Sequence, residues 1–128
     1  MNVKAEIVQT DAAPKAIGPY SQAIRCGGWL FVSGQIPLDP ATGELVTGDF
    51  AQQVTRVLDN LDAVLRAAGF GRASVVKTTA YLTDLARFAE FNGIYAKFFD
   101  QHRPARAVVG VAALPRGAQI EVEAVAAG

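Results

Sequence analysis

The clearest hydrophobic pattern in the chain predicts an amphipathic helix that begins after Asp49 and ends at Gly69. Asp49 is a suitable N-cap, and Gln52, three residues later, completes a possible capping box. Apolar residues then recur at helical spacing on one face: Val54, Val57, Leu58, Leu61, Val64 and Leu65. The polar residues of the segment lie away from this stripe: Gln53, Arg56, Asn60 and Arg66.

A second helix is expected after Asp84, with a buried stripe of large side chains: Leu85, Phe88, Phe91, Tyr95 and Phe98. Alternation, β-branched content and glycine pairs predict strands over residues 3–8, 20–26, 29–33, 74–83, 105–113 and 118–126. The order is therefore β-β-β-α-β-α-β-β, an α+β arrangement. Two such helices cover only one face of a four- to six-stranded sheet, so the other face is exposed or covered by another subunit.

The last two strands are expected to form a hairpin through residues 114–117. One set of alternating positions holds Val109, Val111, Ile120, Val122 and Ala124. The opposite set holds Arg106, Val108, Gly110, Glu121, Glu123 and Val125. Strands with apolar residues on both faces do not suit a sheet with one face in water, which predicts self-association through the uncovered face.

Length and composition predict one globular domain over residues 1–128, since 51% of the chain is hydrophobic and 19% is charged. Twelve basic residues balance twelve acidic ones, which gives no electrostatic basis for binding nucleic acid or a membrane surface. Cys26 is the only cysteine and cannot form an internal disulfide. The charged N-terminal segment does not resemble a signal peptide, and no apolar stretch approaches the roughly 20 residues of a membrane helix. We expect a soluble, cytoplasmic protein.

Arg106 is the first candidate for chemistry, because it stands at the start of an apolar strand, where a guanidinium needs a partner. It could clamp a substrate carboxylate, or it could extend to water or pair with an acidic neighbour. Glu121 and Glu123 share one strand face. Either could act as a general base, or both could lie on a solvated face. Burial of that face in an oligomer would favour a catalytic role for a glutamate, because Arg106 is expected across the hairpin from this face.

Tyr20 follows Gly18 and Pro19 on a loop, where it could line a ligand site or pack the turn. Asn92 and Tyr95, one turn apart on the second helix, suit packing and capping. His102 is the only histidine, which argues against Ser-His-Asp and Cys-His catalysis. The sequence contains no metal-ligand spacing and no phosphate-binding loop.

Four segments, in order over nearly the whole chain, resemble the RidA/YjgF family of reactive-intermediate deaminases. They are Gly18-Pro19-Tyr20-Ser21-Gln22-Ala23, Val32-Ser33-Gly34-Gln35-Ile36-Pro37, Asn92-Gly93-Ile94-Tyr95 with Phe98-Phe99, and Pro104-Ala105-Arg106 through Leu114-Pro115 to Ile120-Glu121-Val122-Glu123. The resemblance implies a chorismate-mutase-like, ferredoxin-like-related fold, assembled as a homotrimer through the open face. It also implies active sites between subunits, with no metal or organic cofactor.

The resemblance further implies hydrolytic deamination of 2-imino or enamine acids, such as 2-iminopropanoate and 2-aminoacrylate, to 2-keto acids and ammonia. Arg106 would hold the substrate carboxylate and Glu121 the attacking water. Tyr20, Gly34 and Asn92 would line the pocket, and backbone near Gly34 and Val108 would contact the substrate nitrogen. Many relatives carry a hydroxyl or thiol just after the arginine, where this chain has Ala107 and Val108.

Two other functions remain as alternatives. The same cleft could serve a non-catalytic module that binds small carboxylates, or a chaperone-like one. A ribonuclease is a third candidate, against which the missing basic patch and the single histidine count.

Overall fold

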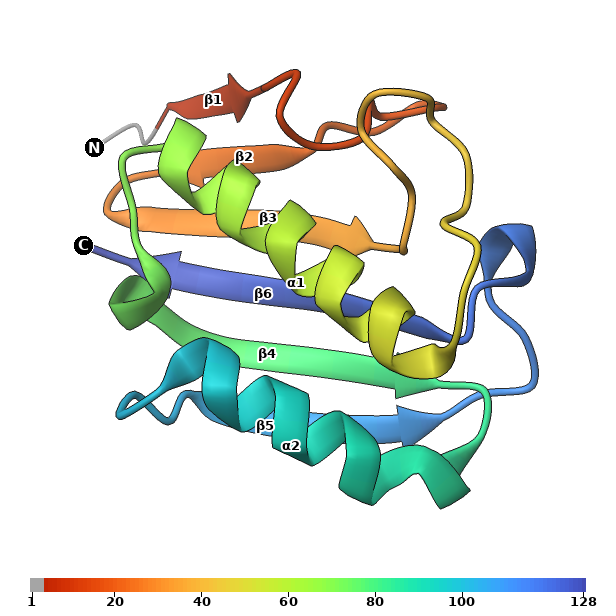
Figure 1. The fold of residues 1–128 in the computed structure, drawn as a ribbon. Helices are drawn as coiled ribbons and strands as arrows, with labels where there is room; N and C mark the ends of the chain where they lie inside the picture. Colours follow the sequence, from red (N-terminus) through yellow and green to blue (C-terminus); the bar gives the residue numbers. More distant parts are fainter. Residues whose placement is uncertain (1–3) are drawn as a thin grey trace.

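A mixed six-stranded sheet carries both helices on one face in the computed structural model, which describes residues 4–128 (Figure 1). The strands are β1 (Ala5–Val8), β2 (Ala23–Cys26), β3 (Trp29–Gln35), β4 (Val75–Leu82), β5 (Ala105–Gly110) and β6 (Ile120–Ala127). They lie in the order β1-β2-β3-β6-β4-β5, and only β4 and β5 are parallel neighbours. The predicted element order and α+β class are confirmed. Val3, included in the predicted first strand, lies outside the described residues.

Helix α1 (Phe50–Ala67) begins with the predicted capping box. The Gln52 amide donates to Asp49 Oδ1 at 3.0 Å, and the Asp49 amide donates to Gln52 Oε1 at 2.9 Å. The predicted apolar stripe is fully buried against the sheet. Gln53 and Asn60 are buried as well, although they lie outside the stripe, because both bond to the backbone of neighbouring loops.

Helix α2 (Phe88–Phe99) follows a short 3-10 turn over Leu85–Arg87 that Asp84 caps. Phe91, Tyr95 and Phe98 are buried as predicted. The expected burial of Leu85 and Phe88 is wrong, since they are 52% and 39% exposed. Both side chains lie at β5, the edge strand of the sheet, where Leu85 is next to Gly110 and Phe88 is next to Arg106, so each keeps one side open to solvent.

The predicted hairpin between the last two strands is also wrong, because β4 lies between β5 and β6. The connection covers residues 111–119, longer than the expected four-residue turn, and this length lets the chain cross β4. Thr78 of β4 pairs with Arg106, and Tyr81 of β4 pairs with Glu121. Residues paired across strands share a face, and Thr78 and Tyr81 point to opposite faces. Arg106 therefore lies on the helix side of the sheet and Glu121 on the open side.

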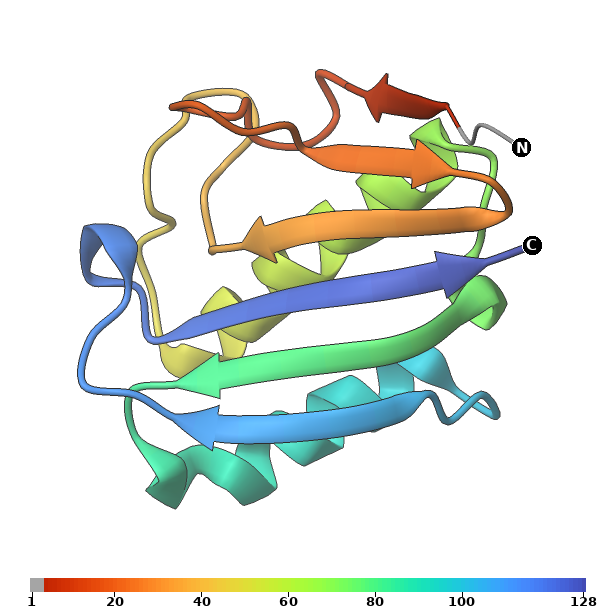
Figure 2. The ribbon, with the colours of Figure 1, turned by 180° about the vertical axis from the view of Figure 1, so that it is seen from behind.

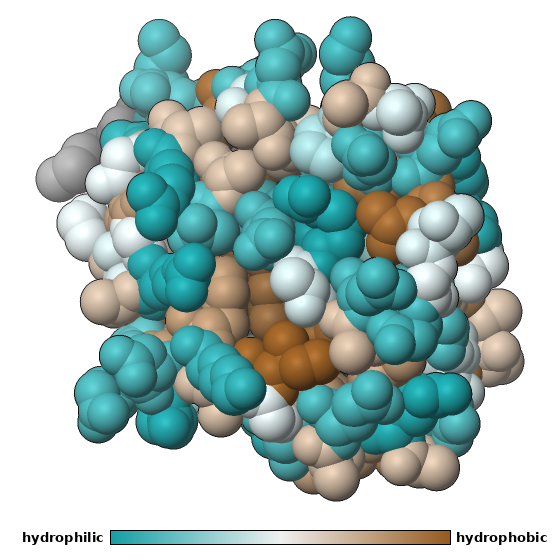
Figure 3. Space-filling view, in the orientation of Figure 1, coloured by the Kyte–Doolittle hydropathy of each residue, from teal (hydrophilic) through white to brown (hydrophobic). Residues whose placement is uncertain are grey.

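The open side has no helix over it, as the view from behind shows (Figure 2). Three of its large apolar side chains are 41–49% exposed: Trp29, Phe31 and Val109. Hydrophilic side chains are spread widely over the opposite, helix-covered side (Figure 3). Self-association through the open side, and a trimer in particular, remain predictions. Within residues 4–128, neither helix combines the length and apolar character required to cross a bilayer.

Candidate active site

Arg106 extends from β5, the edge strand of the sheet, toward α2. Its Nη1 donates to Asn92 Oδ1 at 2.8 Å, so one side chain of α2 fixes the direction of the guanidinium. The guanidinium carbon also lies 4.9 Å from the ring centre of Tyr95, 5.6 Å from that of Phe88 and 5.7 Å from that of Phe91. Aromatic faces attract a guanidinium and restrict it without neutralising its charge.

A cavity of about 370 Å³ lies beside this guanidinium, lined by Asn92, Tyr95, Ala96, Arg103, Pro104 and Arg106. None of the described carboxylates forms an ion pair with Arg106. Arg103 is engaged elsewhere, because it donates to the backbone carbonyls of Asp100 and His102 at the end of α2. Arg106 is thus an oriented, exposed cation that is free to bind a carboxylate.

Tyr95 and Val108 lie between the Arg106 guanidinium and the protein core. The Tyr95 hydroxyl bonds to that of Thr78 at 2.7 Å, and burial is the main cause of the raised pKa of this phenol. Val108 points to the same side as Arg106 and packs partly against the core. Because β5 is the edge strand, one row of its backbone groups has no strand partner in residues 4–128.

Glu121 occupies the other side of the sheet, where it is half-buried on β6. Burial is the larger cause of its raised pKa, and the charge of Glu123 is the second. Glu123 accepts a hydrogen bond from the Tyr81 hydroxyl. The described residues form no ion pair with either glutamate, so the open side carries two neighbouring carboxylates that no cation contacts.

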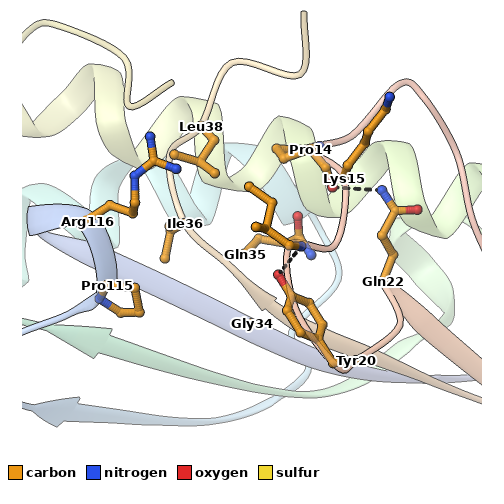
Figure 4. A pocket seen from close by; sticks show the side chains of 11 residues that line it. Pro14, Lys15, Tyr20, Gln22, Gly34, Gln35, Ile36, Leu38, Pro115 and Arg116 are labelled. Carbon is orange, nitrogen blue, oxygen red and sulfur yellow. Dashed lines mark hydrogen bonds between the residues drawn. The ribbon is translucent and has the colours of Figure 1, made fainter. Parts of the chain in front are cut away.

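Gly34 lies directly against the Glu121 carboxylate, at an irregularity of β3 between Val32 and Gln35. A Cβ atom at position 34 would stand 1.9 Å from Glu121 Oε2, so only glycine leaves room for the acid in its present position. Gly34 also lines a cavity of about 220 Å³ together with Tyr20, whose hydroxyl accepts from the Ile17 amide at 3.3 Å (Figure 4).

The predicted site residues therefore form two clusters. Tyr20, Gly34 and Glu121 lie at the open side and the adjoining loops, whereas Asn92 and Arg106 lie on the helix side. The predicted approach of Arg106 to Glu121 within one chain is wrong, because it depended on a hairpin that does not form.

Sequence reasoning missed the surroundings of both clusters. Phe88 was assigned to the core, yet it borders the Arg106 guanidinium. Arg116 was treated only as part of a turn, yet it lines the cavity beside Tyr20. A cation in a Leu-Pro-Arg-Gly turn just ahead of the strand bearing Glu121 was a signal available in the sequence.

His102 lines neither cavity, and its Nε2 atom lies 2.6 Å from the carbonyl oxygen of Val75. In the part of the chain that the structure describes, no three His, Cys, Asp or Glu residues are grouped as metal ligands would be.

The fold and the two clusters define a small α+β protein of the RidA/YjgF type. Residues 10–128 match the family model described as Endoribonuclease L-PSP. The chain is 48% identical over 125 residues to Reactive Intermediate Deaminase A, chloroplastic, of Arabidopsis thaliana, covering 98% of this chain and 67% of that protein. It is 50% identical over 121 residues to RutC family protein PH0854 of Pyrococcus horikoshii, covering 94% and 96%.

The crystal structure of Escherichia coli TdcF with bound serine has the same fold, with a TM-score of 0.92. Its sequence is 42% identical to this chain, and the match covers 96% of this chain and 98% of TdcF. The chain belongs to this family, as the sequence motifs predicted.

Proposed function

We propose that the protein is a deaminase that hydrolyses 2-imino acids, and the enamines that tautomerise to them, to 2-keto acids and ammonia. The observation that carries the proposal is the exposed Arg106 guanidinium, which Asn92 orients and no described acid neutralises. Such a group suits the carboxylate that every 2-imino acid carries. The Arabidopsis relative is named a reactive intermediate deaminase, and TdcF was crystallised with serine, a small amino acid.

The active site is proposed to combine two copies of the chain. Arg106 and Glu121 lie on opposite sides of the sheet, so one copy does not present both groups to a small substrate. A homotrimer would place Arg106 of one copy beside Glu121, Gly34 and Tyr20 of the next. The exposed apolar side chains of the open side support such an assembly.

The reaction needs only water as a co-reactant. Glu121 would accept a proton from a water molecule while the water oxygen bonds to the imine carbon and the nitrogen gains a proton. The resulting carbinolamine then loses ammonia as its C–N bond breaks and its hydroxyl becomes the keto oxygen. Fixing the carboxylate and the water in one place lowers the entropic part of the barrier. Backbone groups near Gly34 and Val108 would bind the nitrogen, so the apolar side chains of Ala107 and Val108 need not prevent activity.

The test is keto-acid and ammonia release from 2-iminopropanoate, generated in situ by oxidation of alanine. Arg106→Ala is expected to lower kcat/KM on the order of 100-fold, the loss typical of a charge-assisted clamp. Arg66→Ala is the matched control, because Arg66 is an exposed cation on α1 that pairs only with Asp62. Full activity of Arg106→Ala would refute the assigned role.

A second variant separates catalysis from binding. Glu121→Gln should bind pyruvate, the keto product, yet hydrolyse the imine slowly. Unchanged hydrolysis would instead favour a module that only binds carboxylates. An RNA-cleavage assay on the same preparations addresses the activity named in the family description. Cleavage that survives in both variants would assign ribonuclease activity to another part of the molecule.

A further inference from the structure

The cavity beside Tyr20 continues from the Glu121 cluster to the turn that precedes β6. Gly34, which touches the Glu121 carboxylate, and Arg116 both line it. Most of its remaining wall is apolar, formed by Pro14, Ile17, Ile36, Leu38 and Pro115. Figure 4 shows Arg116 and Tyr20 on opposite sides of this space, with Ile36 next to Arg116 and Gly34 near Tyr20. An extended molecule with one end at Gly34 would therefore reach a cation at the other.

The charged side chains that line this cavity are all basic. Lys15 and Arg116 line it, and no carboxylate does. The Lys15 ammonium points away from the other labelled side chains in Figure 4, which leaves Arg116 as the relevant cation. The described residues give the Arg116 guanidinium neither a hydrogen bond nor an ion pair.

The backbone of Arg116 is in a conformation that favours glycine, with φ at 63° and ψ at 16°. Among the described residues, Asp100 is the only other non-glycine residue with positive φ. A side chain in this region costs roughly 1 kcal/mol or more. Glycine would suit this backbone better than arginine, so the presence of a long cation here is consistent with a use for the guanidinium itself.

We propose that this cavity receives the substrate side chain and that Arg116 selects 2-imino acids whose side chain ends in a carboxylate. The inference rests on the proposed function, because it takes the reacting carbon to lie beside Glu121. Apolar walls would bury the methylene groups of such a side chain, and the guanidinium would bind its terminal carboxylate. Arg116 is thereby a residue that determines specificity, distinct from Arg106, which holds the carboxylate common to all substrates.

The test compares the binding of two stable keto acids by calorimetry. 2-Oxoglutarate carries the terminal carboxylate, and 2-oxopentanoate has a methyl group in its place. The wild-type protein should prefer 2-oxoglutarate by about fivefold, as expected for a partly exposed ion pair, and less in high salt. Arg116→Gly and Arg116→Asn should abolish the preference, and Arg116→Lys should keep most of it.

The substitutions are not expected to unfold the protein, because glycine and asparagine adopt the left-handed backbone conformation more readily than arginine does. Both variants should therefore melt at or above the wild-type temperature while they lose selectivity. A preference that persists in Arg116→Gly would overturn the proposal, and so would a wild-type protein that binds both keto acids equally or neither. Keto-acid binding is measured without turnover. Failure of imine hydrolysis would therefore overturn the proposed function, whereas the binding preference would still show whether Arg116 selects a terminal carboxylate.

Discussion

Glu121 differs from an ordinary surface glutamate because its surroundings oppose its ionised form. Burial is the first cause of its raised pKa, and the charge of Glu123 is the second. Tyr81 holds Glu123 in place through a hydrogen bond, and Lys77, further along β4 on the same side, pairs with neither acid. A carboxylate with a raised pKa is the stronger base once it is ionised, which suits proton abstraction near neutral pH.

The pH dependence of turnover should reveal this environment. Because Glu121 must be ionised to accept a proton, kcat/KM should fall as the pH falls through its raised pKa. Glu123→Gln removes one of the two causes of the raised pKa, so the acidic limb of the profile should move to lower pH. Glu44→Gln, an exposed acid on the loop after β3, should leave the profile unchanged. An unmoved limb in Glu123→Gln would show that Glu123 does not tune the base.

Stability should respond in the opposite direction to activity. The folded-state pKa of Glu121 lies above its unfolded value, so the ionised form disfavours folding. The loss of folding stability is absent at pH values below the pKa of Glu121 in the unfolded chain. It develops as the pH rises through the pKa of Glu121 in the folded protein. Glu121→Gln should therefore melt at a higher temperature than wild type at pH 7, with a gain in unfolding free energy below about 1 kcal/mol because the group is only half-buried. The two proteins should melt alike near pH 3, and a lower melting temperature at pH 7 would contradict the argument.

At the scale of elements, the irregular end of β3 positions Glu121. Gly34→Ala would place a methyl group where Glu121 Oε2 now stands, 1.9 Å from the new carbon. The carboxylate can swing away without moving the backbone, so we expect a small change in stability and a loss of activity of at least about tenfold. Gly93→Ala is the control, because a Cβ there meets nothing within 4 Å. Equal activities of the two variants would show that the position of the acid does not matter.

Local signals predicted the elements well but did not predict how they pair. The capping box at Asp49 and the stripe that follows are local, and both are confirmed. The burial of Asn60 depends on the carbonyls of Ile36 and Leu38, more than 20 residues away in the chain, which helical spacing does not reveal. The path of residues 111–119 across β4 is likewise set by sheet packing.

This one error in pairing changed the interpretation of the site. A hairpin would have put Arg106 and Glu121 on one face of one chain, whereas the sheet order puts them on opposite faces. The family motifs identified candidate residues, but motifs do not say which copy of the chain supplies each residue. Only the sheet order shows that the two charged groups must belong to different molecules if they act together.

For the whole molecule, two features favour assembly of identical copies. The open side of the sheet exposes the large apolar side chains Trp29 and Phe31 on β3 and Val109 on β5, which are costly to leave in water. The chain has no net charge at pH 7, so its copies do not repel one another through a shared excess charge. A closed ring of three copies would cover the open side and pair each Arg106 with a neighbouring Glu121.

Mixing two inactive variants tests this arrangement directly. Arg106→Ala keeps Glu121, and Glu121→Gln keeps Arg106. In every mixed trimer, one of the three interfaces therefore combines an intact Arg106 from one variant with an intact Glu121 from the other. Random co-assembly of equal amounts makes about three quarters of the trimers mixed, so activity should return to about a quarter of the wild-type value. Co-expressed and co-purified variants would be assayed for imine hydrolysis, with light scattering to count the subunits. If both residues served one chain's own site, co-assembly would restore nothing, and a protein that remained monomeric would leave Arg106 and Glu121 without a shared substrate.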